Sequence, residues 1–492
     1  MSTKTDERKI ELHYKSNDLE FKSHIKIKVQ GSSSLHYTKK NYTIKLYEDN
    51  TYNEKKDVEL KNNWGKQHKY YLKANWIDKT HSRNIVTSNL IAQTQKKYNL
   101  FMDSPNNGQI DGFPVEVYIN KEFLGLYTWN IPKDNWMLNM DNSNENHIAI
   151  ISNNHSLTNK FKDTTTLTNN DWEIECGPET EETITKFNRL INFIKNSSDE
   201  EFKTNFNEYL NLDAMLNYYV FTEVATLTDS IDKNMLLTTY DGEIWYPTLY
   251  DLDTSWGTTW KGTETIEYNA SMEPNYNDSI LFQKFQKNFS KEIANRYFDL
   301  RKNILTKENI IKEFNTFNNS IPKSTLEKEN TKWGPNIPGY NLNQIEKFLE
   351  ARLPILDNKI YAYYKETPQI DIKHETLKPT IKPVKVTLKT NRNDIIFIKD
   401  GKKSYNYTYT FKKNGTYTLE YQDWYGNNLG TITIEINNIK TNLVISTCLA
   451  ILIIIIGIIL VIKSRKNTTK KDNKPKEEKN NQKQSKKKSP KK

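Results

Sequence analysis

The chain has 492 residues and a formal net charge of +10, so it is too long for one ordinary domain. Residues 463–492 hold 14 Lys/Arg and 3 Asp/Glu, which leaves the rest of the chain close to neutral. Without a basic excess or a recognisable motif in the folded part, nucleic acid is not an expected partner. The chain has only two cysteines, Cys176 and Cys448, which excludes a disulfide framework and a cysteine-built zinc site.

The N-terminal part predicts strands and holds the first candidate cations. Side chains alternate between apolar and polar from Tyr42 to Tyr47, just after a turn at Gly31, which predicts a β-strand. Lys45 on this strand is our first candidate for a cation that binds the phosphates of a nucleotide, and Lys40 is the second. The competing interpretation is that both lysines simply face water in a lysine-rich chain.

A helix is predicted next, with Asp78 or Thr80 as its N-cap. Arg83 lies at the start of this helix, where it could clamp a phosphate or pair with a carboxylate. His81 has no second histidine at metal-ligand spacing, so we interpret it as a structural or surface residue.

The first acidic cluster follows a long helical region. Residues 185–225 show apolar side chains at helical spacing, which predicts buried helices that lead the chain to Asp229. Asp229 precedes Asn234 by five positions, which is the Asp-to-Asn spacing of a protein-kinase catalytic loop. The competing interpretation is a pair of plain core helices followed by a polar loop.

The second acidic cluster, with Asp251 and Asp253, comes just after an apolar run and ahead of a glycine. Between the two clusters, Asp241-Gly242 separates apolar runs at 235–240 and 244–246, which is a strong hairpin signal. A hairpin would bring both clusters to the same end of a small sheet. There they could share one or two magnesium ions.

The residue types suit phosphoryl transfer. ATP arrives as a magnesium complex, and magnesium prefers carboxylate oxygens. Asp229 could orient and deprotonate an acceptor hydroxyl, Asn234 and Asp251 could hold metal, and Asp253 could be a second metal ligand or a support. The competing interpretation is that each cluster, taken alone, is simply the polar end of a hairpin. Asp251-x-Asp253 also fits the metal site of a nucleotide-sugar glycosyltransferase.

Several blocks resemble the CotH kinase family, the spore-coat protein H-like atypical kinases. The resemblance spans roughly residues 20–366 and includes both acidic clusters. In chain order, the further blocks that carry it are Gly31-Ser32-Ser33-Ser34, Lys39-Lys40-Asn41-Tyr42-Thr43-Ile44-Lys45, the Tyr71–Asn84 segment with Asp78, Thr80, Arg83 and Asn84, Pro114–Asn120 with Phe123–Tyr127, and Phe348–Arg352 running to Asp357.

This resemblance implies an α+β domain over residues 1–366, an atypical protein-kinase-like fold with a strand-rich N-terminal lobe and a more helical C-terminal lobe. It implies an ATP-dependent protein Ser/Thr kinase that needs Mg²⁺ or Mn²⁺. The implied substrate is a Ser-containing surface or spore-coat protein, with Lys-rich targets suggested by the family alone. A non-catalytic cell-surface binding protein on the same fold is the main alternative.

A second, smaller domain is predicted toward the C-terminus. Residues 279–318 and 342–365 are helical in period, and a Pro/Lys/Thr linker follows at 367–380. Residues 381–440 then alternate in short runs with turns between them, which predicts a small all-β sandwich. Part of this segment resembles bacterial immunoglobulin-like surface modules.

Residues 443–462 form an uncharged apolar run long enough to span a bilayer as a helix. The flank 463–480 carries eight Lys/Arg, whereas the equivalent stretch before the run carries only Lys440. The positive-inside rule therefore predicts a single-pass cell-membrane protein with a basic, disordered cytoplasmic tail at 463–492 and the bulk of the chain outside. The first nine residues show no apolar signal segment, so a kinase domain left inside, anchored by its C-terminus, stays an alternative.

Overall fold

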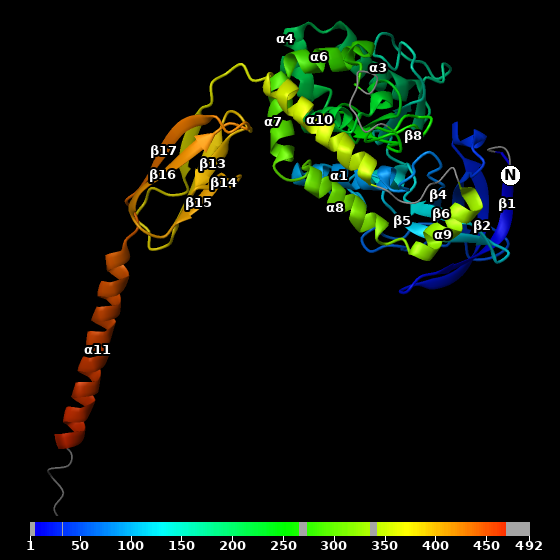
Figure 1. The fold of residues 1–492 in the computed structure, drawn as a ribbon. Coiled ribbons are helices and arrows are strands. Elements are labelled where there is room, and N and C mark those ends of the chain that lie inside the picture. The colour runs from blue at the N-terminus through cyan, green and yellow to red at the C-terminus, as the bar shows by residue number, and fades with distance from the viewer. Residues whose placement is uncertain (1–4, 32, 265–272, 335–341, 469–492) are drawn as a thin grey trace, which may run out of the picture. The chain divides into compact units, whose positions relative to one another are not determined.

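The computed structural model describes residues 5–31, 33–264, 273–334 and 342–468, so most of the predicted tail lies outside the described residues. The chain divides into two compact units (Figure 1). The first comprises residues 1–369 with 391–394, and the second residues 370–390 with 395–492. The mixture of helices and several sheets confirms the α+β class, while the likeness to a two-lobed kinase remains a prediction.

The first unit begins with a six-stranded antiparallel sheet. Its apolar face forms the core around Ile44, Tyr70, Tyr127 and Trp129, and its other face carries polar side chains. Residues 41–47 form a strand, as their alternation predicts. In spatial order the strands are β1 (Glu7–Lys15), β2 (Glu20–Gln30), β3 (Asn41–Tyr47), β4 (Lys69–Lys73), β6 (Glu122–Asn130) and β5 (Gly112–Ile119).

A second, four-stranded sheet carries the predicted hairpin. Its strands, in spatial order, are β10 (Tyr246–Leu249), β9 (Met235–Thr239), β7 (Ile148–Ser152) and β8 (Trp172–Cys176). β9 and β10 pair antiparallel, with Met235 opposite Leu249, so the hairpin is confirmed.

Helices surround these sheets, and two of them are buried on nearly every side. These are α1 (Arg83–Lys97) and α5 (Leu212–Val224), which contact each other. The N-cap of α1 is Ser82 rather than Asp78 or Thr80. The remaining helices are α2 (Asn135–Leu138), α3 (Glu181–Asn196), α4 (Asp199–Asn205), α6 (Ile280–Asn288), α7 (Ser290–Arg301), α8 (Lys307–Asn318), α9 (Lys323–Trp333) and α10 (Asn343–Tyr361).

The second unit contains two antiparallel sheets that share a core around Val386, Phe397 and Ile434. One sheet has the order β11 (Ile370–His374), β12 (Val384–Thr390) and β15 (Thr408–Phe411), and the other β14 (Lys402–Ser404), β13 (Ile396–Lys399), β16 (Gly415–Gln422) and β17 (Asn428–Ile436). The strand β11 lies inside the segment predicted as a linker, 367–380. Nearby prolines favour a linker there, although Ile370 and Ile372 alternate with polar residues as in a strand. The immunoglobulin-like assignment remains a prediction.

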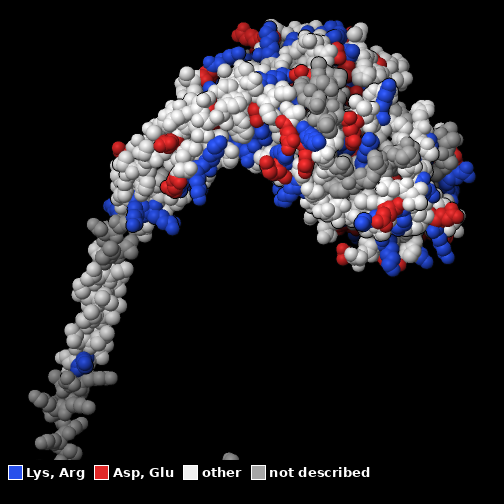
Figure 2. Space-filling view, in the orientation of Figure 1, with Lys and Arg blue, Asp and Glu red and all other residues white. Residues whose placement is uncertain are grey.

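The helix α11 (Thr441–Thr468) contains the predicted membrane segment. Its stretch Ser446–Arg465 is long and apolar enough to cross a membrane, and its side chains are not covered by other parts of the chain. In Figure 2 this helix is white along most of its length, whereas the folded units carry Lys, Arg, Asp and Glu across the face in view. The length and composition are those of a single-pass anchor.

Candidate functional site

The hairpin places the two acidic clusters at one end. Asn234 directly precedes β9 and Asp251 follows β10 by two residues, and the pairing of Met235 with Leu249 puts both at the same end. Asn234 and Asp251 have φ angles of 58° and 60°, in the left-handed region that Asn and Asp tolerate better than most residues. Such conformations cost energy and cluster at functional sites.

Asp229 lies in a 3-10 turn (Thr228–Ile231) that α5 holds in place. The Tyr218 hydroxyl on α5 donates to the Ser230 carbonyl oxygen at 2.6 Å, and the Lys233 amide donates to the Asp229 carbonyl oxygen at 2.7 Å. The Asp229 side chain is half-buried, and its carboxylate has no hydrogen-bond partner among the described residues. This carboxylate is therefore available to a ligand on a rigid base.

The first residues of α1 hold the loop that contains Asp251 and Asp253. The Leu252 amide donates to Asn84 Oδ1 at 3.1 Å, and Arg83 Nε donates to the Ser255 carbonyl oxygen at 3.1 Å. On the other side, the Trp256 amide donates to the Ala225 carbonyl oxygen at the end of α5 at 2.9 Å. The two acidic loops are thus tied to the two buried helices.

The acidic side chains share one electrostatic environment. Burial and the negative charges of Asp251, Asp78 and Asp229 together raise the pKa of Asp253 to about 8, while Lys73 opposes them. The same two loop carboxylates, Asp251 and Asp253, contribute to the raised pKa values of Tyr37 and Tyr250. Burial and the neighbouring acids therefore disfavour ionisation of Asp253 by more than the nearby cation Lys73 offsets.

A divalent cation suits this donor set. Asp251, Asp253 and Asp229 are hard oxygen donors without hydrogen-bond partners among the described residues, and an added cation would relieve their mutual repulsion. Within the described parts of the chain, however, no three His, Cys, Asp or Glu side chains already converge in a ready-made metal site. The residues thus fit a metal chemically, and Asp251 and Asp253 would hold it with Asn234.

Asp232 serves as an internal contrast. It lies in the same segment as Asp229, but it is buried and paired with His155 Nδ1 at 2.7 Å and Lys160 Nζ at 3.6 Å. Asp232 is therefore a structural acid, which the spacing to Asn234 alone could not distinguish from a functional one.

Arg83 is held by protein partners on several sides. It is fully buried, and besides Ser255 it donates to Gln344 Oε1 at 2.6 Å and Glu264 Oε1 at 3.0 Å, and it pairs with Asp78. Of the two predicted roles, the ion pair with carboxylates is the one observed. The reason is local, since the Asp78 carboxylate also accepts the Arg83 amide at 2.8 Å and fixes the start of α1.

The two lysines predicted to bind phosphate have other described neighbours than the acidic loops. Lys40 Nζ donates to the carbonyl oxygens of Leu35 at 2.6 Å and of Tyr37, and so closes a turn. Lys45 lies among other lysines on the polar face of the first sheet, and burial together with Lys69, Lys28 and Lys26 lowers its pKa. Neither lysine is among the charges that act most on Asp253.

Sequence reasoning missed Lys73, the cation that acts most on Asp253. Lys73 ends β4, on the face it shares with Lys69 and Tyr71. The sequence feature that could have indicated Lys73 is the alternation of the segment that begins at Tyr71. It places Lys73 on the polar face, shortly before Asp78. Because Lys73 and Asp253 are far apart in the sequence, no local pattern indicates this electrostatic interaction.

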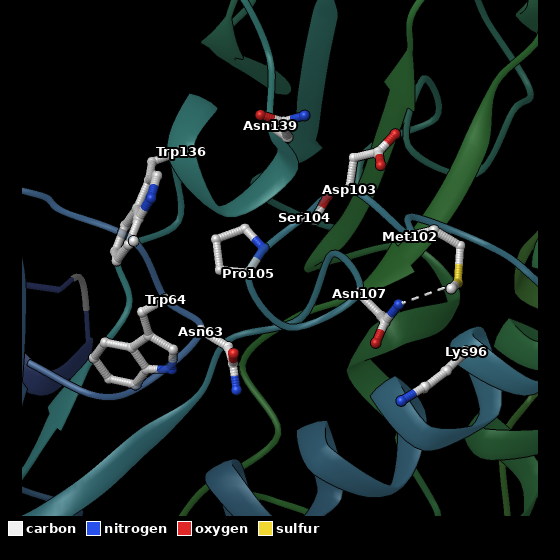
Figure 3. A pocket seen from close by; sticks show the side chains of 11 residues that line it. Asn63, Trp64, Lys96, Met102, Asp103, Ser104, Pro105, Asn107, Trp136 and Asn139 are labelled. Atoms are coloured by element: carbon white, nitrogen blue, oxygen red, sulfur yellow. Dashed lines mark hydrogen bonds between the residues drawn. The ribbon is translucent and has the colours of Figure 1, made fainter. Parts of the chain in front are cut away.

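A separate pocket of about 670 Å³ lies near the other end of α1 (Figure 3). Trp64 and Trp136 lie on one side of it, and Met102 and Lys96 lie across from them. None of the seven predicted site residues lines it, so this pocket is not the acidic site.

The fold and the site define a mixed α+β protein whose acidic loops stand on two buried helices. The family model described as CotH kinase protein matches residues 27–356, which is well over half of the chain. The chain therefore belongs to the CotH kinase family, as the sequence blocks predicted. Membership suggests a kinase-like protein and, in general, the use of a nucleotide and a divalent metal. A comparison with curated proteins gave no match.

Proposed function

We propose that this protein is a membrane-anchored, ATP-dependent protein kinase that transfers the γ-phosphoryl group to Ser or Thr of a surface or spore-coat protein. The observation that carries the proposal is the gathering of the carboxyl groups of Asp229, Asp251 and Asp253 at one end of the β9–β10 hairpin, where burial and the neighbouring acids raise the pKa of Asp253. A protein that keeps such a cluster on rigid supports is suited to a divalent cation, such as the metal ion of a magnesium–nucleotide complex.

The residues would divide the work as follows. Asp229 would accept the proton of the acceptor hydroxyl, because its carboxylate is half-exposed and has no described partner. Asp251 and Asn234, with Asp253 in support, would hold Mg²⁺ or Mn²⁺, which neutralises charge on the phosphates when bound. Lys73 would face the same phosphates from β4, in the place first assigned to Lys45 or Lys40. Arg83 and Asn84 would position the Asp251–Asp253 loop.

The proposed location follows from α11. With this helix in the cell membrane, the positive-inside rule places the basic tail in the cytoplasm and the two units outside. An outside kinase would need ATP on that side.

The test is phosphate incorporation by the full-length chain in detergent, with labelled ATP, Mg²⁺ or Mn²⁺, and a Ser-containing acceptor. We expect Asp251→Asn and Lys73→Met each to lower kcat/KM by at least about a hundredfold, because both remove charge at the transferred group. Glu243→Gln, an exposed change in the loop at the opposite end of the same hairpin, is the matched control and should keep the wild-type rate.

Other outcomes separate the alternatives. ATP binding without transfer would favour a non-catalytic binding protein. Binding of a nucleotide sugar in place of ATP, lost in Asp251→Asn, would favour a glycosyltransferase.

A further inference from the structure

Four lysines stand directly opposite one another on four adjacent strands of the first sheet. Lys9 on β1 pairs with Lys26 on β2, Lys26 pairs with Lys45 on β3, and Lys45 pairs with Lys69 on β4. We call these four residues the lysine row. Neighbouring strands lie about 4.8 Å apart, so the row crosses about 14 Å of the polar face.

The lysine row is a cost to stability that the described structure offsets only in part. Like charges directly opposite each other destabilise a sheet. Of the four charges that act most on Lys45, three are lysines and only Glu7 is negative. Lys69 pairs with Asp134 at 3.0 Å, but Lys9, Lys26 and Lys45 have no ion pair among the described residues.

Aromatic rings order the ammonium groups without neutralising them. Lys9 Nζ lies 4.7 Å from the centre of the Tyr52 ring, and Lys26 Nζ lies 5.1 Å from that of Tyr47 and 5.8 Å from that of Tyr52. The row is therefore an arranged set of positive charges on an open face, with Lys9 exposed and the others half-exposed.

The same face of the sheet also carries Lys73, which acts on the acidic site. Lys69 and Lys73 lie on one side of β4, and the four residue steps from one to the other span about 13 Å. Lys73 in turn acts on Asp253. Lys69 in the row and Lys73 at the candidate active site therefore share one face of β4, with the buried Tyr71 between them.

We propose that the lysine row is a docking surface for an acidic segment of the protein acceptor, in which Glu or Asp recurs at alternate positions. Same-side residues of an extended chain recur every ~6.7 Å, so three such carboxylates span about 13 Å and match the row in length and charge. The row would repel a Lys-rich segment, so the docking segment would be separate from any Lys-rich stretch that the family resemblance implies for the acceptor. The docking proposal rests on the proposed function only in taking the neighbouring acidic site to be the active site of a kinase.

The binding test uses the full-length chain in detergent without ATP. The probe is a fluorescent Ser-containing peptide with Glu at alternate positions, compared with the same peptide carrying Gln and with one carrying phosphoserine. We expect the Glu peptide to bind about tenfold more tightly than the Gln peptide at low salt, with a smaller difference at 0.5 M salt. Lys9→Gln/Lys26→Gln should remove most of this preference.

The matched control is Lys385→Gln/Lys389→Gln, two exposed lysines on β12 of the second unit, which should keep the preference. Because repulsion is relieved, Lys9→Gln/Lys26→Gln should melt at the wild-type temperature or above it. Equal binding of the Glu and Gln peptides, binding of the phosphoserine peptide alone, or a lower melting temperature of this variant would each overturn the proposal.

Kinetics separate this proposal from the proposed function. If transfer occurs, the Lys9→Gln/Lys26→Gln variant should raise KM for the acidic acceptor about tenfold and leave KM for ATP unchanged. A rise in KM for ATP instead would assign the row to the nucleotide and overturn the docking proposal. Peptide preference without any transfer would keep the docking surface and reject the kinase.

Discussion

At the scale of single residues, His81 is a buried titratable side chain in an unfavourable environment. It is buried, its φ angle is 58°, and neither ring nitrogen has a hydrogen-bond partner among the described residues. Burial lowers its pKa to about 3, with the positive charge of Lys39 acting in the same direction and Asp78 opposing it. His81 is therefore a neutral histidine in a place where a proton cannot be accommodated.

This predicts an acid sensitivity with a defined direction. Between pH 3 and pH 6.5 the unfolded chain protonates this histidine and the folded chain does not, so the free energy of unfolding falls as the pH drops through that window. From pH 7 to pH 4.5 the loss amounts to roughly 2–3 kcal/mol, at about 1.4 kcal/mol per pH unit. His81→Asn, which tolerates the same backbone angle, should lose this part of the acid sensitivity.

The measurement is urea denaturation at pH 7 and pH 4.5 for the wild type, His81→Asn and the exposed-histidine control His36→Asn. The difference between the two pH values should shrink only in His81→Asn. An unchanged difference in that variant would show that His81 does not carry the effect.

At the scale of elements, the helix α9 is joined to the first sheet by a buried ion pair. Lys39 Nζ lies 2.6 Å from Glu329 Oε1, and both side chains are buried. Glu329 Oε2 also accepts the Leu126 amide at 2.7 Å on β6, and Lys39 Nζ lies 4.5 Å from the centre of the Tyr127 ring. The ion pair therefore connects α9 to β6 in the protein interior.

A double-mutant cycle tests this pair. Lys39→Met or Glu329→Leu alone should lower the free energy of unfolding by about 3–5 kcal/mol, because each leaves one buried charge without a partner. The double variant should be clearly more stable than the sum of the two changes implies. Additive losses in urea denaturation would mean that the two charges do not stabilise each other.

The elements also indicate what the sequence could predict. The hairpin of Asn234, Asp251 and the turn at Asp241-Gly242 was predictable because turn residues and alternation act locally. The pairing of Lys39 with Glu329 joins residues 290 positions apart, and no local pattern marks it. For the same reason the sequence points to Lys45 and Lys40 and does not single out Lys73, since alternation gives the face of a strand but not the loop that lies near it.

At the scale of the whole molecule, α11 should decide where the chain is found. We expect the full-length chain to stay in the membrane fraction after alkaline carbonate washing, as an apolar helix of this length does. Ile454→Arg/Ile455→Arg should shift much of the chain to the soluble fraction, since each charge at the centre of the helix costs about 2.5–3.5 kcal/mol. Ser464→Arg, at the end of the helix, should stay with the membrane. Release of the wild type would reject the anchor.

The assembly of the acidic site from distant segments has a consequence for biosynthesis. Lys73, Asp78, Asp229 and Asp253 come together only when β4, α1, α5 and the β9–β10 hairpin are all in place. Contacts between such remote parts of a chain form late in folding, whereas the antiparallel neighbours β1, β2 and β3 can pair early. A nascent chain should therefore form its lysine-rich sheet before its acidic site. That site should stay incomplete until synthesis has passed the second acidic cluster.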